Sequence, residues 1–430
     1  MLKKLILVLL FLVVQSSFGQ TRIKTMFYNL LQYDNNSYSQ NKTSDLLSIL
    51  NEAQPDLFLV CELKSEAASN YLYDNAVKPY NSNFSKATFQ NSQSPATDLL
   101  QMAYYNSQKL ILESTKVIPT GVRDINRYTF KLNTVDAAAN PVRVQVYVTH
   151  LKASTHPDDR LDRLESVEDF VTDLSTIPSD SFVIFAGDFN FYTSNESGYQ
   201  KILSNSNPIK IIDPINRPNP VWPSGNTEQF YFDNRWDSDS SDNYRQYFYN
   251  NSDFADIHSQ STRGTQVNGE GSTGFMDDRF DYIMLSNNFT TSSDFYYVAD
   301  SYKTLGNNGN CFDGSVNDAS CSGTYSQSFR NALYNFSDHL PIYLEIESSQ
   351  NTLSTENFAS IHFINSNVSS HSITINSSEV KEIRIFNQLG QQIDRIQINQ
   401  SQTEINISSY SKGVYYLRSK NSKPIKFLKI

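Results

Sequence analysis

The segment FVIFAGDFN, residues 182–190, joins a short apolar run to a turn that carries two polar side chains. Phe182–Ala186 is apolar throughout and predicts a buried strand, at whose end GDFN (187–190) follows. A Gly-Asp-x-Asn string is by itself typical of a turn, because Asp and Asn bond to nearby backbone and tolerate unusual dihedral angles. Asp188 and Asn190 become candidate functional residues because other apolar segments of the chain also end in polar side chains.

These other segments carry polar side chains of the kinds used in catalysis. Because strand ends on one edge of a sheet converge in space, the residues can form one site. Taken singly, a His after a strand is more often a hydrogen-bonded structural residue, and a lone Glu is usually solvated. In chain order the residues are Asn29 after MFY (26–28), Glu62 after Asp56–Cys61, His150 after VYVT (146–149), Asp281 in DDRFDYI (277–283), and Asp338 and His339 in FSDHLP (336–341).

This set of side chains suits the hydrolysis of phosphate esters. Carboxylate and amide oxygens favour a hard cation such as Mg²⁺, with Mn²⁺ or Ca²⁺ as alternatives, and no Cys or His cluster suits zinc. His339 and Asp281 predict an imidazole–carboxylate pair in which the acid fixes the tautomer. His150 supplies a second imidazole for proton transfer or a phosphate contact. Arg263 is either a phosphate contact or a surface arginine in a loop.

Residues 22–347 alternate between apolar strands and amphipathic helices, which predicts an α/β domain. Thr43–Ala53 has helical spacing, and Asp159–Leu174 predicts a helix whose apolar face holds Leu161, Leu164, Val167, Phe170 and Val171. Two long polar segments, about 214–274 and 302–331, interrupt this rhythm and carry no motif of their own. Loops of this length in a compact domain are usually functional or decorative insertions.

The composition of the chain excludes a disordered protein, and its charge limits how it can bind phosphates. The chain has 430 residues with 26 Tyr and 27 Phe, which excludes a disordered chain. Residues 21–351 contain 24 Lys and Arg against 40 Asp and Glu, so this body binds phosphates poorly by charge alone. A substrate phosphate therefore requires a bound cation. No apolar run after residue 20 is long enough for a transmembrane helix.

Four segments of the chain together resemble motifs of the endonuclease/exonuclease/phosphatase family. They are PDLFLVCELK (55–64), AGDFN (186–190), DDRFDYIMLS (277–286) and SDHLPI (337–342). The resemblance implies a four-layer α/β/β/α sandwich with two mixed β-sheets. It implies that Glu62 binds the metal with Asn29 beside it, and that Asp338 helps to bind or tune the metal. Leu31 departs from the pattern, because some members carry an acid two residues after the motif Asn. The catalytic residues implied are Asp188, which orients the water, Asn190, which holds the phosphate, His339 paired with Asp281, and His150.

The N-terminus predicts export. Met1–Gln20 reads MLKKLILVLLFLVVQSSFGQ, with two lysines, a ten-residue apolar run and small residues before Gln20, which is typical of a secretory signal peptide. Exported chains can form disulfides, and Cys311 and Cys321 lie ten residues apart in one polar loop, so a local bridge is expected. Cys61 lies in an apolar run and is expected to be a buried free thiol.

The C-terminus predicts a separate small domain. We expect the catalytic domain to span 21–347, a linker 348–357 and a small C-terminal β-sandwich domain 358–430. This domain resembles the C-terminal sorting domain of type IX secretion cargo. The matching segments are the RIFNQLGQ turn (384–391), the KGVYYLR strand (412–418) and the basic, apolar last strand. The resemblance implies the type IX secretion machinery as partner and a secreted or cell-surface location. The alternative is a generic β-domain that binds a carbohydrate or a partner.

The sequence therefore predicts a secreted, Mg²⁺-dependent phosphodiesterase, with nucleic acid as substrate and internal cleavage. One alternative is a sphingomyelinase-like or other phosphoesterase of the same family, and another is a non-catalytic surface-binding protein. Aromatic residues of the first insertion are expected to stack on bases or to line a sugar or lipid-headgroup pocket. These residues are Trp222, Tyr231, Trp236, Tyr244, Tyr247 and Tyr249.

Overall fold

The computed structural model divides the chain into two compact units, one ending at Leu353 and the other beginning at Ser354. The expected signal peptide and most of the expected linker lie outside the residues that the structure describes. The described residues are 21–96, 98–234, 244–351, 362–363, 367–376, 382–398, 400, 402–419 and 425–430.

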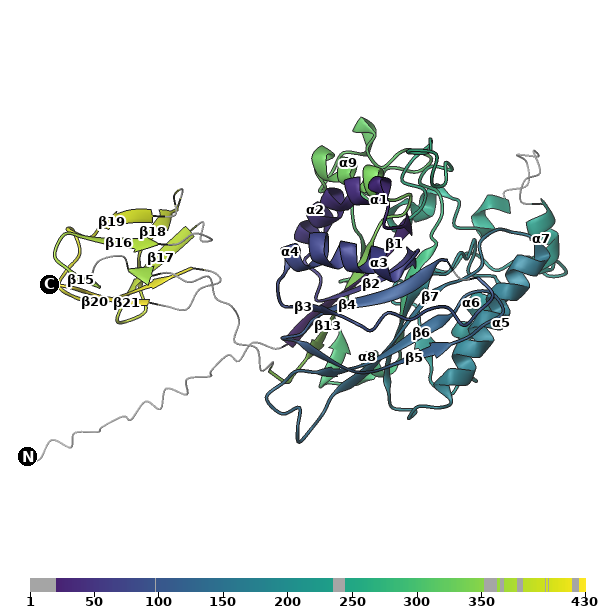
Figure 1. The fold of residues 1–430 in the computed structure, drawn as a ribbon, viewed down its shortest axis with the longest axis horizontal. Helices are drawn as coiled ribbons and strands as arrows, with labels where there is room; N and C mark the ends of the chain where they lie inside the picture. Colours follow the sequence, from purple (N-terminus) through teal and green to yellow (C-terminus); the bar gives the residue numbers. More distant parts are fainter. Residues whose placement is uncertain are drawn as a thin grey trace, which may run out of the picture. The chain divides into compact units, whose positions relative to one another are not determined.

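The first unit contains two β-sheets (Figure 1). The first sheet has the order β11-β13-β1-β2-β4-β3, with β12 paired to β13, and the second has the order β5-β6-β7-β8-β10-β9. Each sheet is mixed, because β1–β2 and β7–β8 are parallel and the other pairs are antiparallel. The strands of the first sheet are β1 (Thr21–Tyr33), β2 (Leu57–Leu63), β3 (Phe84–Lys86), β4 (Leu100–Asn106), β11 (Phe295–Tyr297), β12 (Lys303–Thr304) and β13 (Ile342–Ser348). Those of the second are β5 (Leu110–Ile118), β6 (Ile125–Leu132), β7 (Arg143–His150), β8 (Phe182–Asp188), β9 (Ile211–Ile212) and β10 (Asp281–Ser286).

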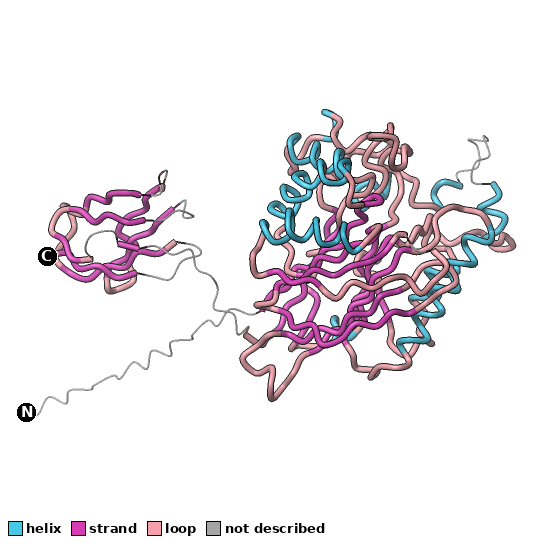
Figure 2. The backbone as a smooth tube through the Cα atoms, viewed as in Figure 1, coloured by secondary structure: helices cyan, strands magenta, loops and turns pink. Residues whose placement is uncertain are grey.

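Helices cover the outer faces of both sheets, as the tube in Figure 2 makes visible. The main α-helices are α1 (Ser37–Asn41), α2 (Thr43–Ala53), α3 (Glu66–Leu72), α4 (Lys78–Tyr80), α5 (Pro157–Leu174), α6 (Ser197–Ile202), α7 (Glu228–Asn234), α8 (Asn288–Thr291) and α9 (Gln327–Phe336). Helix α2 contacts α9 over the first sheet, and α5 contacts α6 over the second. Among the described residues, no helix combines the length and apolar character needed to cross a membrane.

Strand β8 explains how two cores form around one sheet. Side chains alternate between the faces of a strand. Val183 and Phe185 therefore pack with α5 in one apolar cluster, whereas Ile184 and Ala186 belong to the cluster between the sheets. The layers are thus helix, sheet, sheet and helix, and the expected four-layer fold is confirmed.

The apolar face predicted for α5 is partly wrong. Leu161 is 51% exposed, whereas Arg160 and Arg163 face inward with Val167 and Phe170. Arg163 is fully buried because its Nη2 lies 2.8 Å from Oε2 of Glu196, which is also buried. A buried ion pair thus rotates the helix away from the face that its leucines indicate.

The two polar insertions are folded rather than extended loops. They contain α7 and short 3-10 helices, among them η2 (Tyr244–Tyr247), η3 (Ser252–Ile257) and η4 (Ala319–Cys321), and the second leads into α9. Cys311 and Cys321 form a disulfide bond that closes part of the second insertion, and Cys61 is a buried free thiol.

The second unit is a small β-domain with its own core. One sheet has the order β14-β16-β19 and the other β15-β21-β20-β17-β18, and isoleucines of both sheets pack together with Leu417 and Phe427. This confirms the expected C-terminal β-domain. Its strands are β14 (His362–Phe363), β15 (Val368–Ser369), β16 (Ser372–Asn376), β17 (Glu382–Asn387), β18 (Gln392–Gln397), β19 (Gln402–Asn406), β20 (Gly413–Arg418) and β21 (Ile425–Lys429).

Candidate functional site

Three strands of the second sheet bring polar side chains into one row. The parallel register of β7 and β8 pairs His150 with Asp188, and the antiparallel register of β8 and β10 pairs Asp188 with Asp281. Since residues paired across a sheet lie side by side, these three are neighbours at one sheet edge. All three are nearly fully buried.

The first sheet contributes Asn29 and Glu62, from irregular ends of the parallel pair β1 and β2. The register shifts after Asn29, and Leu31, Gln32 and Glu62 have left-handed φ angles of 51°, 46° and 61°. The bulge aims backbone N–H groups at the site: that of Leu31 donates to Asn29 Oδ1 at 3.0 Å, and that of Gln32 donates to Glu62 Oε2 at 2.8 Å. Such local strain is common at functional sites.

One amide links the two sheets across the site. Asn29 Nδ2 donates to Glu62 Oε1 at 2.9 Å and to Asp188 Oδ2 at 3.0 Å. Asn29 itself is held by Ser337, whose hydroxyl donates to the Asn29 carbonyl oxygen at 2.8 Å. The amide therefore fixes the spacing of two carboxylates that would otherwise repel each other.

The imidazole of His339 is paired with Asp281 by geometry. His339 Nδ1 lies 2.8 Å from Asp281 Oδ2, which also accepts a hydrogen bond from the Ser259 hydroxyl at 2.6 Å. The other ring nitrogen, Nε2, lies 3.6 Å from Asp188 Oδ2. Burial opposes a charged ring here, but the carboxylates of Asp281 and Asp188 outweigh it and hold the pKa of His339 well above its usual range.

Glu62, His150 and Asp188 form a group that fits a metal ion. One ligand atom from each lies within 4.8 Å of the others, with His150 Nε2 at 3.9 Å from Glu62 Oε1 and 3.6 Å from Asp188 Oδ2. Burial, followed by Arg123 and His339, holds the pKa of His150 well below its usual range, so its ring is neutral and can act as a ligand. Two carboxylates and a neutral imidazole suit a divalent cation.

Burial and neighbouring carboxylates oppose negative charge on Asp188 and Glu62. Burial raises the pKa of Asp188 to about 7, and Asp281 and Glu62 act in the same direction. Burial, followed by Asp338, also raises the pKa of Glu62. A bound divalent cation would relieve this repulsion, which is a second reason why the residues fit one.

The remaining predicted residues surround this centre. Asn190 has a φ of 52°, and its Nδ2 donates to the Leu151 carbonyl oxygen at 3.2 Å. Asp338 Oδ2 accepts the Ser272 backbone N–H at 2.7 Å, and the part that Asp338 is expected to take in binding or tuning the metal stays a prediction. His150, expected to serve in proton transfer or as a phosphate contact, lies in the group of three that could hold a metal ion.

Arg263 is not the surface arginine that one interpretation of the sequence required. It is fully buried, and its guanidinium lies 5.5 Å from the centre of the Tyr334 ring. The neighbouring Thr262 N–H donates to the Asp338 carbonyl oxygen at 2.9 Å. Arg263 therefore follows a residue that is bonded to the segment carrying Asp338 and His339, and its role as a phosphate contact stays a prediction.

The aromatic residues of the first insertion pack mainly on one another. Trp222 and Tyr231 stack at 4.9 Å, and Tyr231 is only 4% exposed. Tyr249 is fully buried, with the Arg279 guanidinium 5.5 Å from its ring centre. Both tyrosines are therefore unavailable as faces for bases, and Trp236 lies outside the described residues.

Two residues of the site had no sequence signal. The side-chain amide of Gln260 lies 2.8 Å from His339 Nε2, and Ser259 bonds to Asp281. Both belong to a polar insertion with no strand pattern, in a segment that pairs with His339 and Asp278 through isolated bridges. A local pattern search cannot find such a contact, because the contact depends on how the insertion folds back.

Comparison with known proteins gives one family match and a set of similar structures. Residues 366–430 match the secretion system C-terminal sorting domain, so the predicted tail is confirmed and the protein is exported to the cell surface or beyond it. No curated protein sequence matches the chain significantly.

The similar solved structures share little sequence identity with this chain. A humanised TDP2 of D. rerio has 16% identity and a TM-score of 0.44, covering 76% of this chain and 98% of its own. The human Nocturnin catalytic domain has 15% identity and a TM-score of 0.44, covering 76% and 95%. An endonuclease/exonuclease/phosphatase from Bacteroides vulgatus has 11% identity and a TM-score of 0.47, covering 77% and 100%.

Proposed function

We propose that this protein is a secreted, divalent-cation-dependent phosphodiesterase that cleaves nucleic acid internally. The observation that supports the proposal is that a group fitting a cation and a histidine–aspartate pair lie next to each other at one sheet edge. The Glu62, His150 and Asp188 group fits a cation, and the His339–Asp281 pair ends 3.6 Å from Asp188. Phosphodiester hydrolysis needs a cation, a positioned water and a group that manages charge on phosphorus oxygens.

Glu62, His150 and Asp188 would hold the cation. When bound, the cation supplies Lewis-acid polarisation of a phosphate oxygen and offsets the negative charge of the surrounding protein. Asn29 keeps Glu62 and Asp188 at the required separation through its two hydrogen bonds. We expect Mg²⁺ to serve, with Mn²⁺ favoured more than usual because one ligand is an imidazole.

The other residues manage protons and position the phosphate. Asp188 would orient the attacking water from its place in the group that fits the cation. His339 is charged and lies next to Asp188, so it can donate through Nε2 to the developing negative charge while Asp281 holds its ring. Asn190, whose Nδ2 donates one hydrogen bond to the Leu151 carbonyl oxygen, would hold a phosphate oxygen with its remaining N–H.

A smaller or lipid phosphoester is the second candidate substrate. The acidic body repels a long polyanion everywhere except at the cation. The burial of Tyr231 and Tyr249 also removes two of the aromatic faces that could have held bases. These two observations favour a sphingomyelinase-like or other small-substrate reaction over a nuclease with extensive base contacts.

The deciding experiment is a substrate panel on the mature chain, residues 21–430. Supercoiled plasmid, structured RNA, sphingomyelin vesicles and inositol phosphates are each incubated with Mg²⁺ or Mn²⁺ and with chelator. We expect plasmid nicking that stops with chelator and with His339→Ala but continues with His371→Ala, a matched histidine control in the C-terminal unit. Turnover of lipid or inositol phosphate with intact plasmid would establish the second candidate instead. Inactivity on all four would favour a non-catalytic binding protein.

A further inference from the structure

A cavity lies where the two polar insertions meet, away from the strand-end site. It has a volume of about 630 Å³, which is within the ~300–1,000 Å³ range of small-molecule sites. One wall comes from the first insertion, including Ile215 and η3, and another from β12 and the loop after it. None of the residues of the strand-end site lines this cavity.

Hydrogen bonds hold the walls of the cavity in place. Asn307 Nδ2 donates to the carbonyl oxygens of Ala255 at 2.7 Å and His258 at 2.9 Å, and so ties the two insertions together. Asn308 Nδ2 donates to the Cys321 carbonyl oxygen at 2.7 Å, next to the disulfide. The cavity is therefore a rigid feature of the fold, which lowers the entropy cost of binding a ligand.

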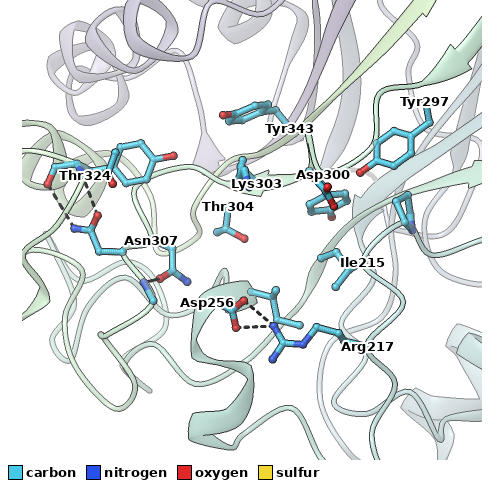
Figure 3. A pocket seen from close by; sticks show the side chains of 16 residues that line it. Ile215, Arg217, Asp256, Tyr297, Asp300, Lys303, Thr304, Asn307, Thr324 and Tyr343 are labelled. Atoms are coloured by element: carbon cyan, nitrogen blue, oxygen red, sulfur yellow. Dashed lines mark hydrogen bonds and ion pairs between the residues drawn. The ribbon is translucent and has the colours of Figure 1, made fainter.

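Four of the sixteen residues that line the cavity are tyrosines. Tyr297, Tyr302, Tyr325 and Tyr343 are all half-buried around the cavity. Figure 3 shows Tyr297 and Tyr343 on one side of the open space and the Arg217–Asp256 ion pair on the other. A tyrosine offers an apolar face together with a hydroxyl that can donate and accept, so this lining suits a ligand that has both C–H surfaces and hydroxyl groups.

The charges of the lining cancel. Arg217 Nη1 lies 2.7 Å and 2.6 Å from the two carboxylate oxygens of Asp256, so each group has its counter-ion. Lys303 and Asp300 are the other charged residues of the lining, and they also have opposite signs. An anion such as phosphate would meet no excess positive charge among these residues, and a divalent cation would meet no free acidic cluster.

We propose that this cavity binds a neutral oligosaccharide. Sugar rings present C–H faces that pack on tyrosine rings, and hydroxyls that bond to tyrosine, Thr304 and the charged pairs of the wall. The cavity binds the sugar without cleaving it, because glycoside hydrolysis requires two free carboxyl groups and Asp256 is already paired with Arg217. It is thus an accessory site that would hold the exported enzyme on a glycan surface.

The test is a titration of the mature chain with neutral oligosaccharides. Disaccharides and trisaccharides of glucose, galactose, mannose and N-acetylglucosamine are added while binding is followed by calorimetry. We expect at least one to saturate a single site. Tyr297→Ala should weaken binding about tenfold or more, because it removes one ring face. Ile215→Trp should also block binding, by filling the cavity without removing an apolar contact.

Two controls separate this site from the rest of the molecule. Tyr71→Ala, at a half-buried tyrosine on α3 outside the cavity, should leave the affinity unchanged. Chelator and His339→Ala should also leave it unchanged, so the result does not depend on the proposed phosphodiesterase activity. The proposal is overturned if no neutral oligosaccharide binds, if binding survives both Tyr297→Ala and Ile215→Trp, or if only charged ligands such as nucleotides bind.

Discussion

Two clusters of buried charge in the first unit differ in how their charges are compensated. At the strand-end site, the buried carboxylates of Asp188 and Asp281 and the partly buried carboxylate of Glu62 lie around the charged ring of His339. Elsewhere, Arg279 forms a two-pronged ion pair with Asp213, with Nη1 to Oδ2 at 2.7 Å and Nη2 to Oδ1 at 2.8 Å.

The two aspartates respond oppositely to the same degree of burial. Burial alone would raise the pKa of Asp213, but Arg279 outweighs it and lowers that pKa. At Asp188 burial prevails and raises the pKa to about 7. A balanced buried pair stabilises its own geometry, whereas an unbalanced cluster remains ready to bind a cation and to move protons. Burial therefore does not distinguish a structural ion pair from a functional cluster of charged groups. The balance between positive and negative groups does.

The largest expected effect concerns the histidine pair of the unbalanced cluster. His339→Ala and Asp281→Ala should each lower kcat by about 1,000-fold, because the ring and the acid act as one device. The double variant should lose little more than either single variant. Steady-state kinetics of the three proteins provide the measurement, and multiplying effects would show that the pair does not act together.

The next effect concerns stability at the balanced cluster. Asp213→Ala should lower the free energy of unfolding by about 3–5 kcal/mol, because it leaves the Arg279 charge buried and unpaired. The matched control is Asp256→Ala, which breaks an exposed ion pair with Arg217 and should cost less than about 1 kcal/mol. Urea denaturation measures both, and equal losses would contradict the distinction between the two ion pairs.

A third effect follows from the raised pKa of Asp188. The folded state retains a proton that the unfolded state releases, so this group's stabilising contribution is lost as the pH rises through about 7. Asp188→Asn cannot lose that proton. The free energy of unfolding of Asp188→Asn, measured relative to that of wild type, should therefore increase by on the order of 3 kcal/mol between pH 5 and pH 8 in chelator. Urea denaturation at both pH values tests this, and an advantage independent of pH would refute it.

A fourth effect concerns the cation itself. A divalent cation at 100 times its Kd should add about 2.7 kcal/mol to the free energy of unfolding. Glu62→Ala should remove most of this gain, whereas Asp213→Ala should keep it despite its lower starting stability. Thermal unfolding with Mg²⁺, Mn²⁺ or chelator provides the measurement. Equal gains in wild type and Glu62→Ala would remove Glu62 from the ligand set.

The smallest effect is expected from removal of residues 352–430. Both clusters belong to the unit that ends at Leu353, so cation binding and activity should change by less than about twofold. Export from the native host should stop, because the sorting domain is lost. A truncated protein that reaches the medium normally would contradict the role of the tail in export.

Much of the site was predictable from local patterns. Apolar runs of strand length ended at Asn29, Glu62, His150 and Asp188, and strand ends on one edge converge whatever the details of the fold. The pairing of His339 with Asp281 was also expected, and the structure places the two groups 2.8 Å apart.

Other contacts lay beyond such patterns. Gln260 reaches His339 from an insertion without strand periodicity, and the exposure of Leu161 follows from a buried ion pair on the opposite side of α5. Asp213 and Arg279 are 66 residues apart, and nothing in either local segment indicates the partner. Each of these contacts depends on side chains that only the folded chain brings together.

By itself the sequence determined an α/β domain, a small C-terminal β-domain and the identity of the chemical groups at the strand ends, whereas the two-sheet fold was implied by the resemblance to a known family. Periodicity and turn residues act over a few positions, so the chain carries that information locally. Tertiary structure alone decided which buried charges are balanced by an opposite charge. It also decided which nitrogen and oxygen atoms come within reach of one cation, and that a cavity forms where the two insertions meet. Those properties depend on strand register and on packing between distant segments, because electrostatic interactions and hydrogen bonds change over fractions of an ångström to a few ångströms.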